Sequence, residues 1–286
     1  MAHPTRPSKL LKSLGARARR SLGQHFLKAP WVLDHILDSA DLGDGDTVLE
    51  IGPGLGVLTE RLAATGHPVV ALEKDDRLAS HLASSLARWT NLRIIQGDGL
   101  EYPLGDLGLE GRIKVVANLP YNVATPLLFR LLESDLGLHA LVVMVQKEVG
   151  DRILADPGTR QYGALTVNLA MLATGHRVVD VPPSAFHPPP KVDSTVLHLR
   201  SLEAPPFDVG DPAVFGRVVS SAFGARRKTL RNALGRGGWS KDVIDGALAS
   251  VGIDGRLRGE TLSVEQFSQL SRAFSSGSFI HDRGVS

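Results

Sequence analysis

A glycine-rich turn between an apolar strand and an apolar helix constrains the fold more than any other stretch of this sequence. Residues 47–51, Thr-Val-Leu-Glu-Ile, have the apolar, β-branched character of a buried strand. Residues 52–56, Gly-Pro-Gly-Leu-Gly, follow at once, and an apolar helical stripe begins at Val57. This succession is typical of nucleotide-binding βαβ units, because glycine lets the backbone turn tightly and approach a ligand closely. The sequence therefore predicts an α/β domain with a Rossmann-like sheet.

Carboxylates near the ends of the predicted strands indicate the kind of ligand. Glu73 ends the next strand, 21 residues after Gly52, which is the expected place for a group that binds ribose hydroxyls. Two details argue against a dinucleotide: the glycine spacing is G-x-G-x-G, and Glu50 would repel a pyrophosphate. Glu50 would suit a cation such as the sulfonium of S-adenosylmethionine, and Asp98, after the third strand, could bind the amine of its adenine. The alternative is that all three are ordinary strand-end or turn carboxylates.

A second motif lies at the end of the β-branched run 113–116, where Asn118, Leu119, Pro120 and Tyr121 follow. Ligands bind at this edge of open α/β sheets. The amide offers an acceptor and a donor, the backbone carbonyls beside Pro120 offer further acceptors, and Tyr121 offers a flat face. Such a set fits a planar heterocycle with an exocyclic amino group. The alternative is a turn built from residues that are common in turns.

A proline-rich segment, residues 182–194, contains five prolines and one aromatic residue, Phe186. Proline stiffens such a loop before any ligand binds. Phe186 could form an aromatic wall opposite Tyr121, so that the two rings sandwich a flipped-out base. Alternatively, Phe186 plugs the core beneath the loop, and the local sequence favours neither possibility.

Basic residues are concentrated in two stretches of a chain whose net charge is only +2. Residues 1–20 and residues 217–236 each contain six arginines and lysines and no acid. Local basic clusters of this kind indicate contact with a polyanion such as a nucleic acid. The alternative is a solvated tail and a solvated helix face.

The order of predicted elements indicates two domains. Strands and helices alternate up to about residue 205, and helices alone follow. We predict a flexible basic arm (1–20), an α/β domain (21–204), a smaller helical domain (205–274) and a frayed tail (275–286).

The absence of cysteine excludes disulfides, thiolate metal sites and cysteine nucleophiles. No apolar stretch approaches the roughly 18 residues of a membrane span, and the basic N-terminus lacks the apolar core of a signal peptide. We therefore expect a cytoplasmic protein with no membrane contact.

Several motifs together resemble the ribosomal RNA adenine N6-dimethyltransferases. They are residues 22–27 (Leu-Gly-Gln-His-Phe-Leu), 50–56 (Glu-Ile-Gly-Pro-Gly-Leu-Gly), 118–121 (Asn-Leu-Pro-Tyr) and 185–194 (Ala-Phe-His-Pro-Pro-Pro-Lys-Val-Asp-Ser). Residues 222–232, Ala-Phe-Gly-Ala-Arg-Arg-Lys-Thr-Leu-Arg-Asn, are similar to the bacterial KsgA/RsmA branch of this family. The resemblance covers roughly residues 20 to 270.

The resemblance implies a methyltransferase with a Rossmann-like sheet and a smaller all-α C-terminal domain. Its methyl donor would be S-adenosylmethionine, with no metal ion. Its substrate would be two adjacent adenosines in the 3′-terminal hairpin loop of 16S ribosomal RNA, each dimethylated at N6. The RNA would be met within the 30S subunit or its precursor, and we expect the enzyme to act as a monomer.

The resemblance also assigns residues to roles. The positions that contact the cofactor would be His25, the backbone at Leu27, Gly52, Glu73, Asp98 and Asn118. The target base would be held by Asn118, Leu119, Pro120, Tyr121 and Phe186. The residues expected to bind RNA are Arg226, Arg227, Lys228 and Arg231. One departure from the family is His25, where asparagine is commoner.

Two other functions are compatible with parts of the pattern. An antibiotic-resistance methyltransferase would act on adenine N6 in 23S ribosomal RNA, but the basic stretch 226–228 and the complete proline-rich loop argue against it. A ribosome-assembly factor could retain a non-catalytic cofactor pocket, although the intact 118–121 motif gives no reason for the pocket to be inactive.

Overall fold

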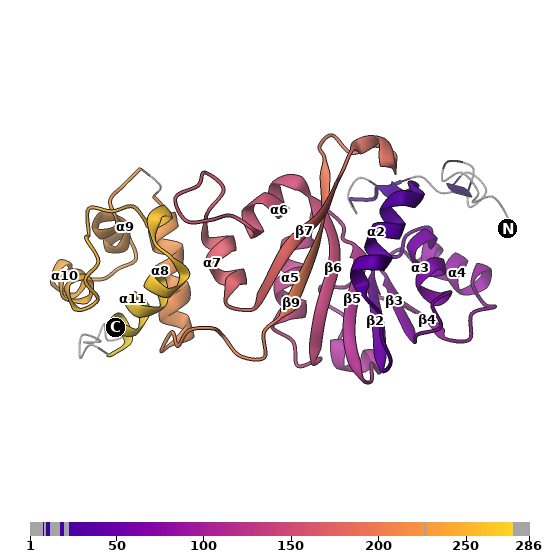
Figure 1. Ribbon diagram of the computed structural model, residues 1–286, viewed down its shortest axis with the longest axis horizontal. Coiled ribbons are helices and arrows are strands. Elements are labelled where there is room, and N and C mark those ends of the chain that lie inside the picture. The colour runs from indigo at the N-terminus through magenta and orange to yellow at the C-terminus, as the bar shows by residue number, and fades with distance from the viewer. Residues whose placement is uncertain (1–7, 9, 12–17, 20–22, 226, 277–286) are drawn as a thin grey trace, which may run out of the picture. The chain divides into compact units, whose positions relative to one another are not determined.

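The computed structural model describes residues 8, 10–11, 18–19, 23–225 and 227–276 (Figure 1). The chain divides into two compact units. The first comprises Met1–Gly150 and Ala173–Ser201, and the second comprises Asp151–Leu172 and Leu202–Ser286. The chain passes from the first unit to the second for the last time between Ser201 and Leu202, close to the boundary that the sequence predicts near residue 205. However, the second unit also takes in a segment that precedes the last strands of the sheet, so the division is discontinuous in sequence.

The first unit is built on a mixed sheet of seven strands among the described residues. In order across the sheet they are β4 (Leu92–Gln96), β3 (Val69–Glu73), β2 (Asp46–Ile51), β5 (Arg112–Asn118), β6 (Leu138–Gln146), β9 (Ser194–Ser201) and β7 (Ala173–Val181). The first five are parallel, and β9 runs antiparallel between β6 and β7. The predicted Rossmann-like fold is confirmed.

Helices cover both faces of this sheet. They are α2 (Pro30–Ala40), α3 (Val57–Ala63), α4 (Asp76–Ser85) and α5 (Ala124–Leu132), and Figure 1 shows α2 in front of the sheet and α5 behind it. The apolar stripe of α2 places Val32, Leu33 and Ile36 in one buried cluster with Val116 and Val142 of the sheet. Because both faces are covered, the central strands are apolar on both sides, which explains their nearly continuous hydrophobic runs.

The strand order reverses direction beside β2. The chain passes from β2 outward to β3 and β4, and then returns to place β5 on the other side of β2. Ligands bind at such a switch point, in the crevice outside the carboxyl ends of the strands. The two motifs singled out in the sequence, which begin at Gly52 and Asn118, follow directly from β2 and β5.

A short two-stranded sheet joins two segments that are far apart in sequence. β1 (Phe26–Leu27) pairs antiparallel with β8 (Phe186–His187), so that Phe26 lies opposite His187 and Leu27 opposite Phe186. The sequence shows no clear period here and predicts neither strand. The pairing places the segment containing His25 beside the proline-rich loop.

The second unit is helical within its described residues. Its helices include α7 (Ala164–Ala170), α8 (Pro212–Phe223), α9 (Leu230–Arg236), α10 (Lys241–Ser250) and α11 (Val264–Ser276), while α6 (Lys147–Ile153) lies where the units meet in sequence. After the basic stretch, α9 begins at Leu230 with Thr229 as its N-cap. Helix α7 ends at Ala170, shortly before β7 begins at Ala173.

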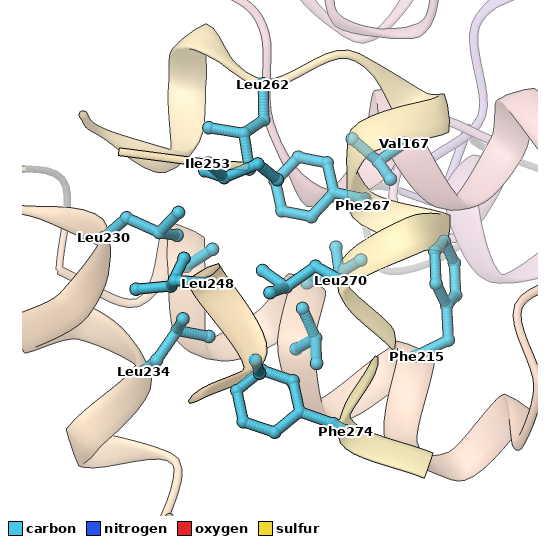
Figure 2. Packing of buried hydrophobic residues seen from close by; sticks show 14 of the residues in the cluster. Val167, Phe215, Leu230, Leu234, Leu248, Ile253, Leu262, Phe267, Leu270 and Phe274 are labelled. Carbon is cyan, nitrogen blue, oxygen red and sulfur yellow. The ribbon is translucent and has the colours of Figure 1, made fainter. Parts of the chain in front are cut away.

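Phenylalanine side chains fill the core of this second unit. Figure 2 shows Phe215, Phe267 and Phe274 converging with leucines of α9, α10 and α11. Tyr162 belongs to the same cluster, and its buried hydroxyl donates to the carbonyl of Leu262 at 2.7 Å. None of the helices in the described part of the chain is long and apolar enough to cross a lipid bilayer.

A buried lysine ties helix α2 to the sheet. Lys114 on β5 is 5% exposed, and its ammonium donates to the carbonyls of Ala40 and Asp41 at the end of α2. It also pairs with Asp46 of β2 at 2.9 Å, so all three N–H groups have an acceptor. Burial alone would raise the pKa of Asp46, but hydrogen bonds from Arg112, Gly43 and Lys114 outweigh it and hold that pKa well below its usual range.

We expect Lys114→Met to lower the free energy of unfolding by about 3 kcal/mol, because it removes one partner of a buried ion pair. Urea unfolding of the full chain measures this loss. The control is Arg88→Met, which breaks an exposed pair with Glu60 and should cost no more than about 0.5 kcal/mol. If the free energy of unfolding fell equally in the two variants, the buried network would contribute no more to stability than an exposed ion pair.

Candidate active site

A pocket opens where the strands β2, β3, β4 and β5 end. Its lining includes all six positions predicted to contact a cofactor and, besides Asn118, three further residues predicted to hold a base. The six are His25, Leu27, Gly52, Glu73, Asp98 and Asn118, and the further three are Leu119, Pro120 and Tyr121. The crevice at the switch point is therefore the candidate active site.

The glycine-rich turn is held by a carboxylate from the neighbouring strand. Gly54 has φ +60°, a region that glycine enters at little cost, and its N–H donates to Glu73 at 2.9 Å. The second oxygen of Glu73 accepts from the N–H of Asp75 at 2.8 Å. Burial raises the pKa of Glu73 above its ordinary value. Two backbone donors thus fix this carboxyl in the pocket wall, where a ribose hydroxyl could reach it.

Glu50 is a second buried acid in the same pocket. It is 2% exposed, and its Oε2 atom has no hydrogen-bond partner among the described residues. Burial raises the pKa of Glu50 to about 8, although the Thr59 hydroxyl opposes this shift, and the charge of the nearby Glu73 contributes to it. A buried carboxyl oxygen without a hydrogen-bond partner is costly, and a positively charged ligand would relieve that cost.

Asp98 lies on the loop after β4 and is bound by Lys74, which the sequence did not single out. The Lys74 ammonium forms an ion pair with Asp98, and the Leu100 N–H donates to its other oxygen at 2.9 Å. Burial alone would raise the pKa of Asp98, but these two hydrogen bonds outweigh it and lower that pKa. Asp98 is therefore an ionised acceptor at one end of the pocket.

The orientation of the Asn118 amide follows from its neighbour. Its nitrogen donates to the backbone carbonyl of His25 at 3.1 Å. A carbonyl can only accept, so the amide nitrogen must face it and the amide oxygen must point elsewhere. That oxygen is buried and has no hydrogen-bond partner among the described residues. The site thus presents an unsatisfied acceptor at the tip of β5, as an amine-binding role requires.

His25 and Tyr121 lie against each other beside this amide. The Nδ1 atom of His25 is hydrogen-bonded to the carbonyl of Pro188 at 2.8 Å. Because a carbonyl can only accept, Nδ1 must carry the proton and donate it. The His25 ring stacks on Tyr121 with centroids 5.5 Å apart and planes inclined by 25°. The Tyr121 hydroxyl is hydrogen-bonded to Ser194, and burial raises the pKa of Tyr121 to about 12, so the phenol is neutral at physiological pH. Ser194 is the last residue of the motif at 185–194, but the sequence predicted no role for it.

Phe186 does not line the pocket. Its side chain is 1% exposed and belongs to the buried cluster beneath α2, and its ring meets Tyr121 edge-on at 6.4 Å. Of the two possibilities that the sequence left open, the structure favours the core residue. A role for Phe186 in gripping the base stays a prediction, and in this structure it would act by supporting Tyr121.

The residues predicted to bind RNA differ in their surroundings. Arg227 and Lys228 are exposed. Arg231 forms an ion pair with Asp245 of α10, an acid outside the basic stretch that only the fold brings near. Arg226 lies outside the described residues.

Described residues of the predicted N-terminal arm pack against other parts of the first unit. Leu11 is buried in a cluster with Phe26, Leu55 and Leu78. Arg19 pairs with Asp75 at 3.3 Å. At these positions the chain is in contact with residues at or beside the pocket, while most of residues 1–20 and the tail from 277 lie outside the described residues.

Comparison with known proteins is consistent with this geometry. The family described as "Ribosomal RNA adenine dimethylase" matches residues 15–275. A protein of Moorella thermoacetica named "Ribosomal RNA small subunit methyltransferase A" is 46% identical over 95% of this chain and 98% of its own length. A protein of the same name from Anoxybacillus flavithermus is 43% identical over 95% of each chain.

Solved structures with similar folds also cover most of the chain. A dimethyladenosine transferase from Plasmodium falciparum superposes with a TM-score of 0.74 at 26% identity, over 86% of this chain and 96% of its own. The 23S rRNA methyltransferase ErmE superposes with a TM-score of 0.66 at 25% identity, over 88% of this chain and all of its own.

Among the described residues, no group of three acidic or histidine side chains is arranged to hold a metal ion.

We expect Glu50→Gln to stabilise the ligand-free protein at pH 8 but not at pH 5. The folded protein keeps a proton on Glu50 up to a pKa of about 8, against a usual value of 4.5, so it binds a proton that the unfolded chain releases between these values. The free energy of unfolding of the parent therefore falls as pH rises through this window, and glutamine removes that dependence. Thermal unfolding from pH 5 to pH 8 measures the difference.

The matched control for this measurement is Glu60→Gln, an exposed carboxylate on α3 that pairs with Arg88. Its unfolding temperature should differ from that of the parent by the same small amount at every pH. A Glu50→Gln difference that is equally flat with pH would contradict the buried, protonated state.

Proposed function

The chain belongs to the ribosomal RNA adenine dimethylase family, and on that basis we propose that it dimethylates N6 of two adjacent adenosines in the 3′-terminal hairpin loop of 16S ribosomal RNA. The family membership makes it an S-adenosylmethionine-dependent methyltransferase acting on ribosomal RNA adenine. The single observation that carries the chemistry is the buried, unpartnered amide oxygen of Asn118 in an acid-lined pocket.

The pocket residues suit S-adenosylmethionine, which supplies a methyl group on a positively charged sulfur. Glu50 has an oxygen without a partner. The proton that it keeps in the ligand-free protein would be released when this cation binds, and the resulting carboxylate would favour the cation. Glu73, fixed by two backbone N–H groups, is placed to accept from ribose hydroxyls. Asp98 would accept from the adenine amine, and the glycine turn allows the backbone to approach closely.

Asn118 would activate the target nitrogen by accepting one of its hydrogens. The exocyclic nitrogen of adenine is a poor nucleophile because its lone pair is delocalised into the ring. Two acceptors for its two hydrogens favour a pyramidal nitrogen whose lone pair is free to attack the methyl group in line. The Pro120 carbonyl already accepts from the Val123 N–H at 3.0 Å, so the Leu119 carbonyl suits the second acceptor better.

Positioning and electrostatics would supply most of the acceleration. No strong base is needed, because the nitrogen carries the positive charge once it has accepted the methyl group, and this cation is acidic enough to lose its proton to water afterwards. The Tyr121 ring, held by Ser194, offers a face for the base, and its neutral hydroxyl does not compete for that proton. After the first transfer one N–H remains, so the pocket must let the monomethylated amine rotate before the second.

The proposed partner is 16S ribosomal RNA within the 30S subunit or its precursor, met by the enzyme as a cytoplasmic monomer. Support comes from the relatives named as small-subunit enzymes and from exposed Arg227 and Lys228 in the helical part of the chain, the predicted RNA-binding domain. A 23S substrate is the second candidate, because ErmE has a similar fold.

Isolated 30S and 50S particles separate these candidates. The protein is incubated with each particle and S-adenosylmethionine, and the adenosines of the RNA are then analysed by mass spectrometry. We expect dimethyladenosine in 16S RNA only. Methylation confined to 23S RNA would favour the second candidate, and no methylation of either would favour a non-catalytic assembly factor.

We expect Asn118→Ala to lower methyl transfer at saturating substrate by about 10²–10³-fold, as when one preorganised hydrogen bond to a reacting group is removed. S-adenosylmethionine affinity, measured by calorimetry, should fall much less. The matched control is Asn91→Ala, which removes a side-chain amide that bonds the carbonyls of Ala63 and His67 outside the pocket. Equal losses of transfer and affinity in Asn118→Ala would mean that its role is cofactor binding.

A further inference from the structure

Arg130 of α5 is bonded to the loop that follows β4. One guanidinium nitrogen donates to the backbone carbonyl of Gly99, and another donates to that of Tyr102 at 2.6 Å. These carbonyls lie at two points of the same loop, residues 97–102, which carries Asp98. The planar guanidinium can hold two acceptors at once in a fixed geometry.

The loop itself is closed around Asp98. The N–H groups of Glu101 and Tyr102 donate to the Asp98 carbonyl at 3.0 and 2.7 Å, and that of Leu100 donates to its side chain. The Tyr102 ring lies so close to Gly97 that a Cβ atom there would meet it at 2.5 Å. The loop is thus held together by its own contacts, so a residue that anchors the loop also helps to place Asp98.

The anchor belongs to the helix that begins just after the base-holding turn. Helix α5 starts at Ala124, three residues beyond Tyr121, and Arg130 lies within it. Gly99 also packs against this helix, because a Cβ atom there would meet Leu127 at 3.1 Å. One helix therefore supports both the turn that carries Asn118 and the loop that carries Asp98.

We propose that Arg130 is a positioning residue that sets the loop 97–102 for the adenine of the cofactor, and this inference rests on the function proposed above. Arg130 does not touch the cofactor in this account. It acts through Asp98, which reads the adenine amine, and its positive charge also helps to keep that carboxyl ionised. Losing the anchor should therefore weaken recognition of the adenine end, with little effect on the transfer step.

A second arginine provides a matched control. Arg93 on β4 also donates to two backbone carbonyls, those of Leu107 and Gly108, which end a short 3₁₀ helix (Leu104–Leu107). Neither carbonyl belongs to a residue that lines the pocket. Arg93→Met thus removes the same kind of anchor from the same unit without touching the loop 97–102.

The test compares full-length parent, Arg130→Met, Arg130→Lys and Arg93→Met. Calorimetry gives the Kd of S-adenosylhomocysteine and of S-inosylhomocysteine, in which a carbonyl replaces the adenine amine. We expect Arg130→Met to raise the first Kd about tenfold and to reduce the preference for the adenosyl ligand. Lysine, which can reach one carbonyl, should restore part of both, and Arg93→Met should change neither. In methylation of 30S particles, Arg130→Met should raise KM for S-adenosylmethionine while kcat stays within about twofold.

An unchanged preference in Arg130→Met would overturn the proposal. Equal rises in Kd for Arg130→Met and Arg93→Met would overturn it too, because they would show a general loss of structure. The binding measurements need no RNA. A parent that binds the adenosyl ligand but leaves 30S particles unmethylated would therefore count against the proposed function, while the binding preference alone decides the role of Arg130.

Discussion

The active site depends on where the hydrogen bonding between β2 and β5 stops. These neighbouring strands pair in parallel only as far as Leu49 and Val115. Beyond that point β2 continues beside β3 to Ile51, and β5 continues beside β6 to Asn118. The two strands at the centre of the sheet therefore end against different neighbours, and the pocket lies between their ends. Glu50 on one side and Asn118 on the other line this opening because of the topology, with no need for a long loop to bring them together.

Three acids line the pocket, and the fold provides them with different partners. Glu73 accepts hydrogen bonds from two backbone N–H groups, and Asp98 forms an ion pair with Lys74. Glu50, in contrast, has an oxygen with no partner among the described residues. Elsewhere in the same unit a buried acid is fully paired, as Asp46 is with Arg112 and Lys114. The contrast separates a structural carboxylate from the one that we propose to face the cationic cofactor. The burial of Glu50 lowers the stability of the ligand-free protein, and we propose that binding of the cationic cofactor offsets this cost.

Local patterns in the sequence predict the parts of the site that depend on position within a strand. Gly52, Glu73, Asp98 and Asn118 each follow or end an apolar run, and a parallel sheet brings such ends to one edge. Contacts between distant segments were not predictable in this way. The two-residue strands β1 and β8 are too short to show a period, so the packing of Phe186 beneath Tyr121 could not be decided. The sequence did not single out Arg130 or Lys74, because their sequence neighbours give no sign of the carbonyls and the carboxylate that they contact in the fold.

The choice of an amide at position 118 follows from both of its neighbours. Its nitrogen must donate, because the His25 carbonyl that it meets can only accept. Its oxygen is then left as an acceptor without a partner, as the proposed contact with an adenine amine requires. Aspartate would set two oxygens against the His25 carbonyl and add another carboxylate to a pocket that already holds Glu50, Glu73 and Asp98. Asparagine meets both requirements without charge, and His25 in turn is held by Pro188 and stacked on Tyr121. The groups proposed to bind the base are thus oriented by segments far away in sequence, which is a physical reason for the motifs at 22–27, 118–121 and 185–194 to occur together.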